Sequence, residues 1–175
     1  MKENHIITLG DFANFVQSLV KGPASSYEKP LEEYLRSLWA LIVEEREQTP
    51  SHALFGYLLS EAFTRKPMQF NENWLSYEKP PFETERDDLS TFEDLQGMIL
   101  YQIADLHRME AKGILDKSAF ELWLGVDSPT GYTWYNFHPN TFLECASASL
   151  AKDSGLIECD WGFLATFLWV GQIYE

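Results

Sequence analysis

Two side chains with metal-binding chemistry lie three residues apart in a stretch with helical periodicity. His107 and Glu110 share one face of the predicted helix, and Asp105 lies nearby. Imidazole and carboxylate groups can bind a divalent cation, but metal sites in helix bundles place Glu before His and repeat that motif on a second helix. The chain has neither this order nor a second motif, and it has no Cys/His zinc spacing. A solvent-exposed helix face is therefore the favoured interpretation, and we expect no metal and no cofactor.

Cys159 is the residue with the clearest potential as a nucleophile, because it directly precedes Asp160, the predicted cap of the last helix. A thiol at a helix N-terminus can have a lowered pKa, and His138 could act as its base. The carboxylate of Asp160 opposes this by repelling a thiolate, which favours an unreactive thiol. The chain also has no glycine-rich phosphate loop and no Gly-x-Ser-x-Gly sequence. We therefore assign no catalytic residue.

The densest charge in the chain is the acidic run at residues 83–94, which follows a segment rich in aromatic residues. Carboxylates speed the encounter with a basic protein, and aromatic side chains supply anchors of the kind found at interaction hot spots. The alternative is a solvated loop whose aromatic residues pack onto the core. We predict that residues 66–94 form the main partner-binding surface. The predicted contact residues are Trp74, Tyr77, Phe82, Glu83, Glu85, Asp87 and Asp88.

The overall charge agrees with an acidic binding surface. The 175-residue chain has a formal net charge of −14. Such a charge repels nucleic-acid phosphates and anionic membrane surfaces, so neither is an expected partner. It favours a basic protein partner, although ordinary acidic bias of a soluble protein explains it as well. The first residues show no signal peptide, and the two cysteines suggest reduced thiols, so a cytoplasmic location is expected.

Helices must position these groups, because the apolar residues recur with a helical period along most of the chain. Predicted starts include Asp11, Pro30, Ser51 and Asp160, and a capping box is expected with Ser90 as the cap and Glu93 three residues later. The six predicted helices cover about residues 11–21, 30–48, 51–65, 90–112, 141–152 and 161–175.

One stretch has the alternation of strands rather than the period of a helix. Phe120, Leu122, Leu124 and Val126 alternate with other residues, turn-forming residues follow, and a second alternating run begins at Tyr132. This pattern predicts a β-hairpin near residues 118–137. We therefore expect an α-rich α+β fold in one domain, residues 1–175, with residues 66–89 as a long ordered loop.

The pentapeptide SYEKP occurs twice, at residues 26–30 and 76–80. The first copy leads into a predicted helix, whereas Pro81 follows the second copy and pushes Pro80 toward extended geometry. We expect the two copies to serve local turns and not to bind a common ligand. An ancient duplication remains the alternative.

Parts of the chain resemble a family of small uncharacterised bacterial proteins. The resemblance rests on an Asp-Phe-x-x-Phe-Val helix, a Tyr-Glu segment that leads into Leu-Glu-x-Tyr-Leu, and a C-terminal Trp-x-x-Leu helix that ends in Tyr-Glu. It covers roughly the first quarter and the last tenth of the chain, and it implies an α-rich bacterial domain without a known activity. The matching residues are Asp11, Phe12, Phe15, Val16, Tyr27, Glu28, Leu31, Glu32, Tyr34, Leu35, Trp161, Leu164, Tyr174 and Glu175.

These observations favour a non-enzymatic, cytoplasmic bacterial protein that binds another protein. An immunity or antitoxin-like protein that blocks a basic toxin is its most specific form. Two alternatives remain open: a small enzyme with a pocket near residues 131–139, and a structural subunit of a larger assembly. The identity of the partner and the oligomeric state do not follow from the sequence.

Overall fold

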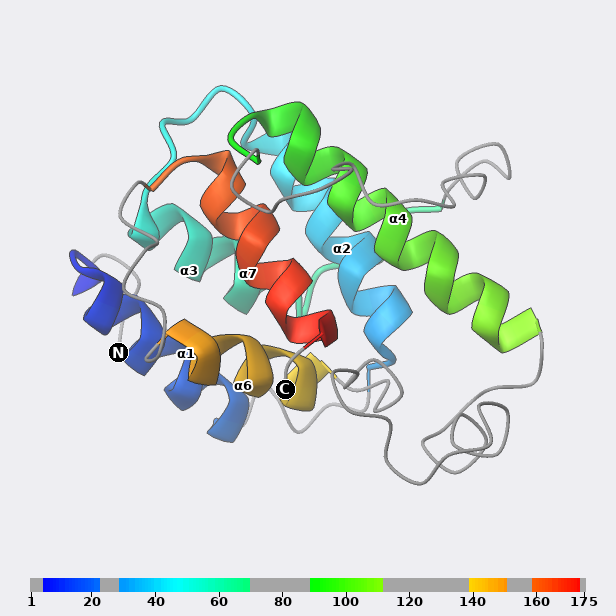
Figure 1. Ribbon diagram of the computed structural model, residues 1–175, viewed down its shortest axis with the longest axis horizontal. Helices are drawn as coiled ribbons and strands as arrows, with labels where there is room; N and C mark the ends of the chain where they lie inside the picture. The colour runs from blue at the N-terminus through cyan, green and yellow to red at the C-terminus, as the bar shows by residue number, and fades with distance from the viewer. Residues whose placement is uncertain (1–4, 23–28, 70–88, 112–138, 151–158, 174–175) are drawn as a thin grey trace.

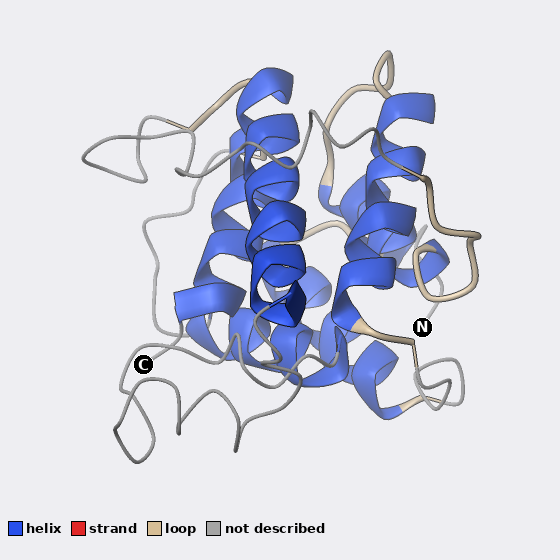
Figure 2. Ribbon diagram, turned by 90° about the vertical axis from the view of Figure 1, so that its right-hand side faces the viewer, coloured by secondary structure: helices blue, strands red, loops and turns tan. Residues whose placement is uncertain are grey.

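The described part of the chain is a bundle of six helices. The computed structural model describes residues 5–22, 29–69, 89–111, 139–150 and 159–173. Figure 1 shows the arrangement of the helices, and Figure 2 shows that helices and loops account for every described segment. The helices are α1 (Leu9–Lys21), α2 (Leu31–Glu44), α3 (His52–Glu61), α4 (Phe92–Ala111), α6 (Pro139–Leu150) and α7 (Trp161–Ile173).

The expected α+β class is wrong for the part of the chain that the structure describes, because that part contains helices and no strand. The class rested on the alternating pattern at residues 118–137, and these residues lie outside the described ranges. The helix-rich part of the expectation is confirmed, since each of the six predicted helices has a counterpart. Residues 66–69 are irregular, and the rest of the predicted loop, residues 70–88, is not described.

Helix α7 forms the centre of the bundle. Every residue from Trp161 to Leu168 is buried, as expected for a helix that is apolar on all sides. The helix packs against α4 and α6, and its place between them is visible in Figure 1. Aromatic rings connect it to other helices: Phe163 lies edge-on to Phe12 of α1 and stacks with Phe55 of α3, with ring centroids 5.4 and 5.8 Å apart.

Local hydrogen bonds set the start of several helices, and two of the observed capping residues differ from the predicted ones. Ser51 and Asp160 cap α3 and α7 as expected, each accepting a hydrogen bond from the backbone N–H three residues later. In α4 the capping residue is Thr91 and not Ser90, and its partner is Asp94 and not Glu93. In α1 the cap is Thr8, and Asp11 completes its capping box. In both helices the Asp carboxylate three residues after the Thr accepts a hydrogen bond from the backbone N–H of that Thr, so Thr–Asp pairs replace the predicted caps.

Helices α2 and α4 lie side by side (Figure 1) and run antiparallel. Ion pairs join them near both ends: Glu32 meets His107, and Arg46 meets Glu93. Arg46 also lies over the ring of Phe92, 4.9 Å from its centroid. This pairing brings the first turn of α2 beside the last two turns of α4.

The lysine of the first SYEKP segment is used structurally. Lys29 Nζ donates hydrogen bonds to Ser37 Oγ at 2.7 Å and to the carbonyl oxygens of Ala62 and Arg65 at 2.9 and 2.7 Å. These carbonyls lie at and just beyond the C-terminus of α3, where a positive charge is favourable. Lys29 therefore holds the beginning of α2 against the end of α3. The second SYEKP copy lies outside the described residues, so the comparison of the two copies stays open.

None of the described helices is both long enough and apolar enough to cross a lipid bilayer.

Candidate functional site

The predicted partner-binding residues are not placed by the structure. Trp74, Tyr77, Phe82, Glu83, Glu85, Asp87 and Asp88 all lie in the range 70–88, outside the described residues. The same holds for His138 and for residues 131–138 of the suggested enzyme pocket. Two other groups of chemically active side chains come together within the described residues.

Cys159 does not have the environment of a nucleophile. Its side chain is partly buried, and desolvation together with the charge of Asp160 raises the thiol pKa to about 11. A thiol with this pKa is protonated at neutral pH, which removes its nucleophilic form. Neither Cys145 nor Cys159 forms a disulfide among the described residues.

His52 packs against the hydrophobic core and is not part of a cluster of metal-ligating side chains among the described residues. Its ring packs against Phe12 and Phe163, with centroids 6.0 and 5.1 Å away. Desolvation lowers its pKa, although a hydrogen bond with the backbone of Ile7 opposes this shift. The imidazole therefore favours its neutral form within an aromatic cluster.

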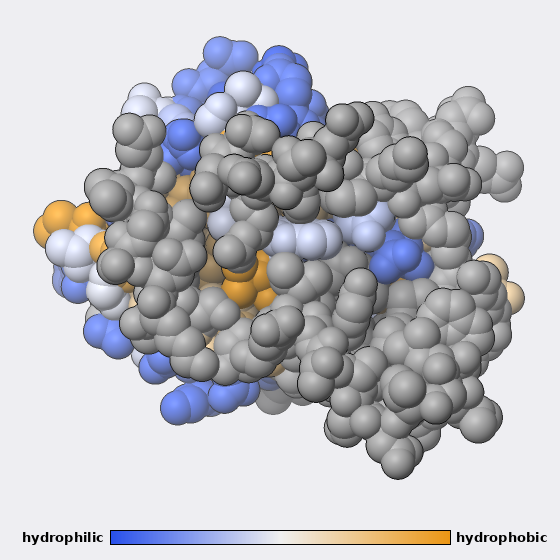
Figure 3. Space-filling model, viewed as in Figure 1, coloured by the Kyte–Doolittle hydropathy of each residue, from blue (hydrophilic) through white to orange (hydrophobic). Residues whose placement is uncertain are grey.

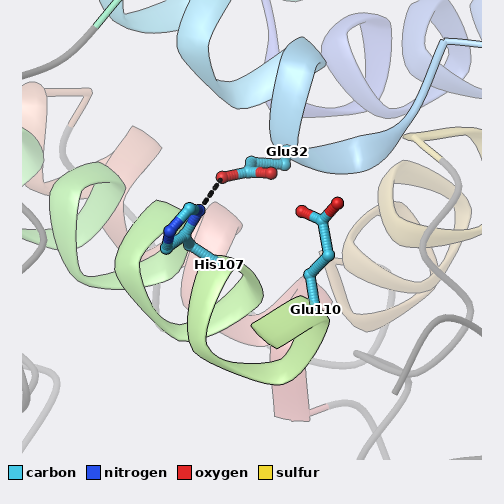
Figure 4. Close-up of side chains that lie close together, drawn as sticks. All are labelled: Glu32, His107 and Glu110. Atoms are coloured by element: carbon cyan, nitrogen blue, oxygen red, sulfur yellow. Dashed lines mark ion pairs between the residues drawn. The ribbon is translucent and has the colours of Figure 1, made fainter. Parts of the chain in front are cut away.

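The first group of interest joins α2 to α4 and consists of Glu32, His107 and Glu110. Figure 4 shows the three side chains extending toward a common space, Glu32 from α2 and the other two from successive turns of α4. His107 Nδ1 lies 3.5 Å from Glu32 Oε1. One ligand-type atom from each of the three residues lies within 4.8 Å of the others. This Glu–His–Glu cluster is the one place in the described ranges where three metal-ligating side chains converge.

Helix geometry explains how the Glu–His–Glu cluster forms. His107 and Glu110 are three residues apart and therefore lie on one face of α4. Glu32 occupies the first turn of α2, where the helix dipole favours a carboxylate. It is held from behind by Arg36, one turn along α2, whose Nη2 lies 2.9 Å from Glu32 Oε1. Only 19% of the Glu32 side chain is exposed, compared with 47% for His107.

Sequence reasoning found two members of this cluster and missed the third. His107 and Glu110 were visible as a pair at helical spacing, but Asp105 was named as their neighbour in place of Glu32. Glu32 is 75 residues from His107 (107 minus 32), and no local pattern connects them. The only signal in the sequence was that the acidic first turn of one amphipathic helix could pack beside the end of another, if the two helices ran antiparallel.

The second group is an acidic surface around Tyr57. Tyr57 is the exposed aromatic residue of α3, with 36% of its surface accessible. Partial burial raises the pKa of its phenol, and the nearby carboxylates of Glu61, Glu45 and Glu44 raise it further. Arg65 acts in the opposite direction and pairs with Glu44 at 2.6 Å. We call Glu44, Glu45, Tyr57 and Glu61 the Tyr57 surface.

Two carboxylates of the Tyr57 surface occupy a position that local stability does not favour. Glu44 is the last residue of α2, Glu45 is its C-terminal cap, and no basic residue lies in the last turn. The negative end of the helix dipole disfavours acidic side chains there. Figure 3 shows hydrophilic side chains gathered at the top of the molecule, where Figure 1 places the end of α2 and the start of α4. Departures from a local rule of this kind are expected at functional positions.

Comparisons of the chain with protein families, with curated proteins and with solved structures found no match. The proposed function therefore rests on the geometry of the two groups alone, and the resemblance to small bacterial proteins stays a prediction.

Proposed function

We propose that this protein binds a basic protein partner, with the Tyr57 surface as one contact region. The observation that carries the proposal is the placement of an exposed tyrosine among three carboxylates on α2 and α3. The net charge of −14 supports the same conclusion, because it speeds the approach of a positively charged protein.

The chemistry of the surface matches an arginine or lysine side chain. A guanidinium group can lie on the face of the Tyr57 ring as a cation–π contact, while its N–H groups donate to a neighbouring carboxylate. Glu44 is already paired with Arg65. Within the described residues no ion pair is recorded for Glu45 or Glu61. These two carboxylates are therefore the ones that a partner cation would meet.

Residues 66–94 are proposed as a second contact region, on the basis of their charge and aromatic content. Trp74, Tyr77 and Phe82 would supply anchors there, and Glu83, Glu85, Asp87 and Asp88 would attract the partner. The most specific form of the proposal is an immunity or antitoxin-like protein. In that form the partner is a basic toxin that this protein blocks by binding to it.

The test uses an arginine-rich peptide and a neutral peptide of equal length as probes. We expect the full-length protein to bind the arginine-rich peptide and to lose affinity as salt rises. Glu45→Lys and Glu61→Lys should each weaken binding at least tenfold, and Tyr57→Ala should speed release. These residues are at least partly exposed, so each variant should keep its stability within about 0.5 kcal/mol.

The matched control is Glu144→Lys on α6, which makes the same change in charge at an exposed site away from the Tyr57 surface. It should change the affinity less than twofold. If Glu144→Lys weakens binding as much as Glu45→Lys does, the peptide responds to net charge alone and the Tyr57 surface is not a binding site. Binding of the neutral peptide with equal affinity would also contradict the proposal.

A further inference from the structure

We propose that the Glu–His–Glu cluster binds a divalent transition-metal ion, with zinc as the representative ion. The site consists of Glu32 from α2 and His107 and Glu110 from α4, which converge in Figure 4. It is separate from the Tyr57 surface, and its existence does not depend on the proposed function.

The spacing of the ligand atoms is close to what a metal ion requires. Two ligands bound tetrahedrally at about 2.1 Å lie about 3.4 Å from each other. His107 Nδ1 and Glu32 Oε1 are already 3.5 Å apart. That separation is long for a charge-assisted hydrogen bond, which has a length of about 2.7–2.9 Å. The pair therefore has the separation of two ligands around one ion.

Glu110 can complete the set with a small movement. Its ligand atom lies within 4.8 Å of the other two, so an approach of at most about 1.4 Å brings it to the tetrahedral separation of about 3.4 Å. The side chain is exposed, and rotation about its χ angles supplies such a movement without a change in the backbone.

The ligand types select the class of metal. An imidazole nitrogen suits zinc, iron, nickel and copper, whereas magnesium and calcium prefer sites made only of oxygen. Two carboxylates balance the charge of a divalent ion. Three protein ligands leave a fourth position for water, and the exposure of His107 and Glu110 gives that position access to solvent.

Arg36 orients one ligand and also limits the affinity. Its guanidinium holds Glu32 Oε1 at 2.9 Å, and ligating carboxylates in metal sites are commonly held by such partners. The positive charge of Arg36 repels a cation, so binding should be weaker than in closed zinc sites with four protein ligands. Oε1 has two lone pairs, so it can bind the ion with one while the other accepts the hydrogen bond from Arg36.

The experiment measures zinc binding to the full-length protein after removal of metals with a chelator. Isothermal titration should show one zinc ion per chain, and magnesium in excess should not displace it. His107→Ala and Glu110→Gln should each weaken zinc binding at least tenfold. Both side chains are exposed, so the variants should fold, which circular dichroism checks.

The matched control is Glu93→Gln, which removes a carboxylate from an exposed site on the same helix. It should change zinc affinity less than twofold. Cobalt provides a second readout, because a site made of nitrogen and oxygen gives d–d absorption without the intense thiolate charge-transfer band.

Three results would overturn the proposal: zinc affinity that His107→Ala and Glu110→Gln leave unchanged, an equal loss in Glu93→Gln, or the thiolate band with cobalt. The first means that the three side chains form only an ion pair on a solvated helix face. The second means diffuse attraction to an acidic surface. The third places the metal on a cysteine.

Discussion

Among the described glycines, Gly162 is the one at which an added side chain would meet the closest neighbouring atoms. It lies in the first turn of α7, directly against the backbone that leads into α4. A Cβ atom at this position would overlap the carbonyl oxygen of Leu89 and lie 2.6 Å from the Cα of Ser90. Backbone atoms cannot move aside as a flexible side chain can. The close approach of α7 to this segment therefore requires the absence of a side chain.

Gly162→Ala should lower the free energy of unfolding by about 3 kcal/mol, because it forces α7 away from the segment at Leu89. Urea denaturation measures the change. Gly10→Ala is the matched control, since a Cβ there meets only Thr8 Oγ1 at 3.7 Å. This control should leave stability unchanged or raise it by less than about 1 kcal/mol, because alanine favours a helix more than glycine does. Equal effects of the two variants would show that Gly162 is not closely packed.

At the scale of the element, the start of α4 depends on two side chains that hold each other. Asp94 N donates to Thr91 Oγ1 at 3.1 Å, and the backbone N–H groups of Ser90 and Thr91 donate to Asp94 Oδ2 at 2.9 Å. Desolvation tends to raise the pKa of Asp94, but the hydrogen bonds from Ser90 and Thr91 outweigh it, and the net pKa is lowered from 3.8. Asp94, one of the carboxylates in the predicted acidic run, therefore takes part in capping α4.

Thr91→Ala should lower the free energy of unfolding by about 1 kcal/mol at neutral pH, the usual effect of removing a helix cap. Urea denaturation measures the change.

Asp94→Asn should also lower the free energy of unfolding, and the size of this effect should depend on pH. The folded pKa of Asp94 lies below the unfolded value, so its contribution is complete above pH 3.8 and is lost as the pH falls through the folded pKa. Urea midpoints of both proteins across this range measure the difference. A difference that persists unchanged at the lowest pH would show that the charge of Asp94 has no part in the cap.

At the scale of the whole molecule, the excess of negative charge opposes the compact state. The chain has 27 acidic and 13 basic residues counted as Asp, Glu, Lys and Arg. The exposed ion pairs Arg46–Glu93 and Arg65–Glu44 offset little of this, because such pairs contribute only a few tenths of a kcal/mol to about 1 kcal/mol. Repulsion among the remaining carboxylates is greater in the folded protein than in the expanded chain.

Raising NaCl from about 0.01 M to about 0.15 M should therefore stabilise the protein, because it shortens the screening length from about 30 Å to about 8 Å. The urea midpoint should rise over this range. Affinity for a basic peptide should fall over the same range, which separates the effect on folding from the effect on binding. A midpoint that falls with salt would mean that local ion pairs outweigh the overall repulsion.

The sequence by itself determined the helices, because helical periodicity and capping act within a few residues of each other. The apolar α7, the caps Ser51 and Asp160, and the face shared by His107 and Glu110 were all predicted on that basis. The caps of α1 and α4 were misplaced where Thr and Asp offered a better pair than the predicted residues. The α+β class is wrong for the described residues, which form helices and no strand. It rested on one alternating stretch, residues 118–137, which lies outside the described ranges.

Tertiary structure alone decided which charged groups on different helices meet. Glu32 reaches His107 only because α2 and α4 pack antiparallel, and Glu44 and Glu45 join Glu61 near Tyr57 only because α3 lies beside the end of α2. Lys29 likewise finds its hydrogen-bond acceptors at the end of α3, more than 30 residues along the chain. Such contacts depend on how helices pack, and packing is set by side chains that are distant in the sequence. Local patterns could therefore identify the candidate residues singly, while the packed bundle determined which of them form a site.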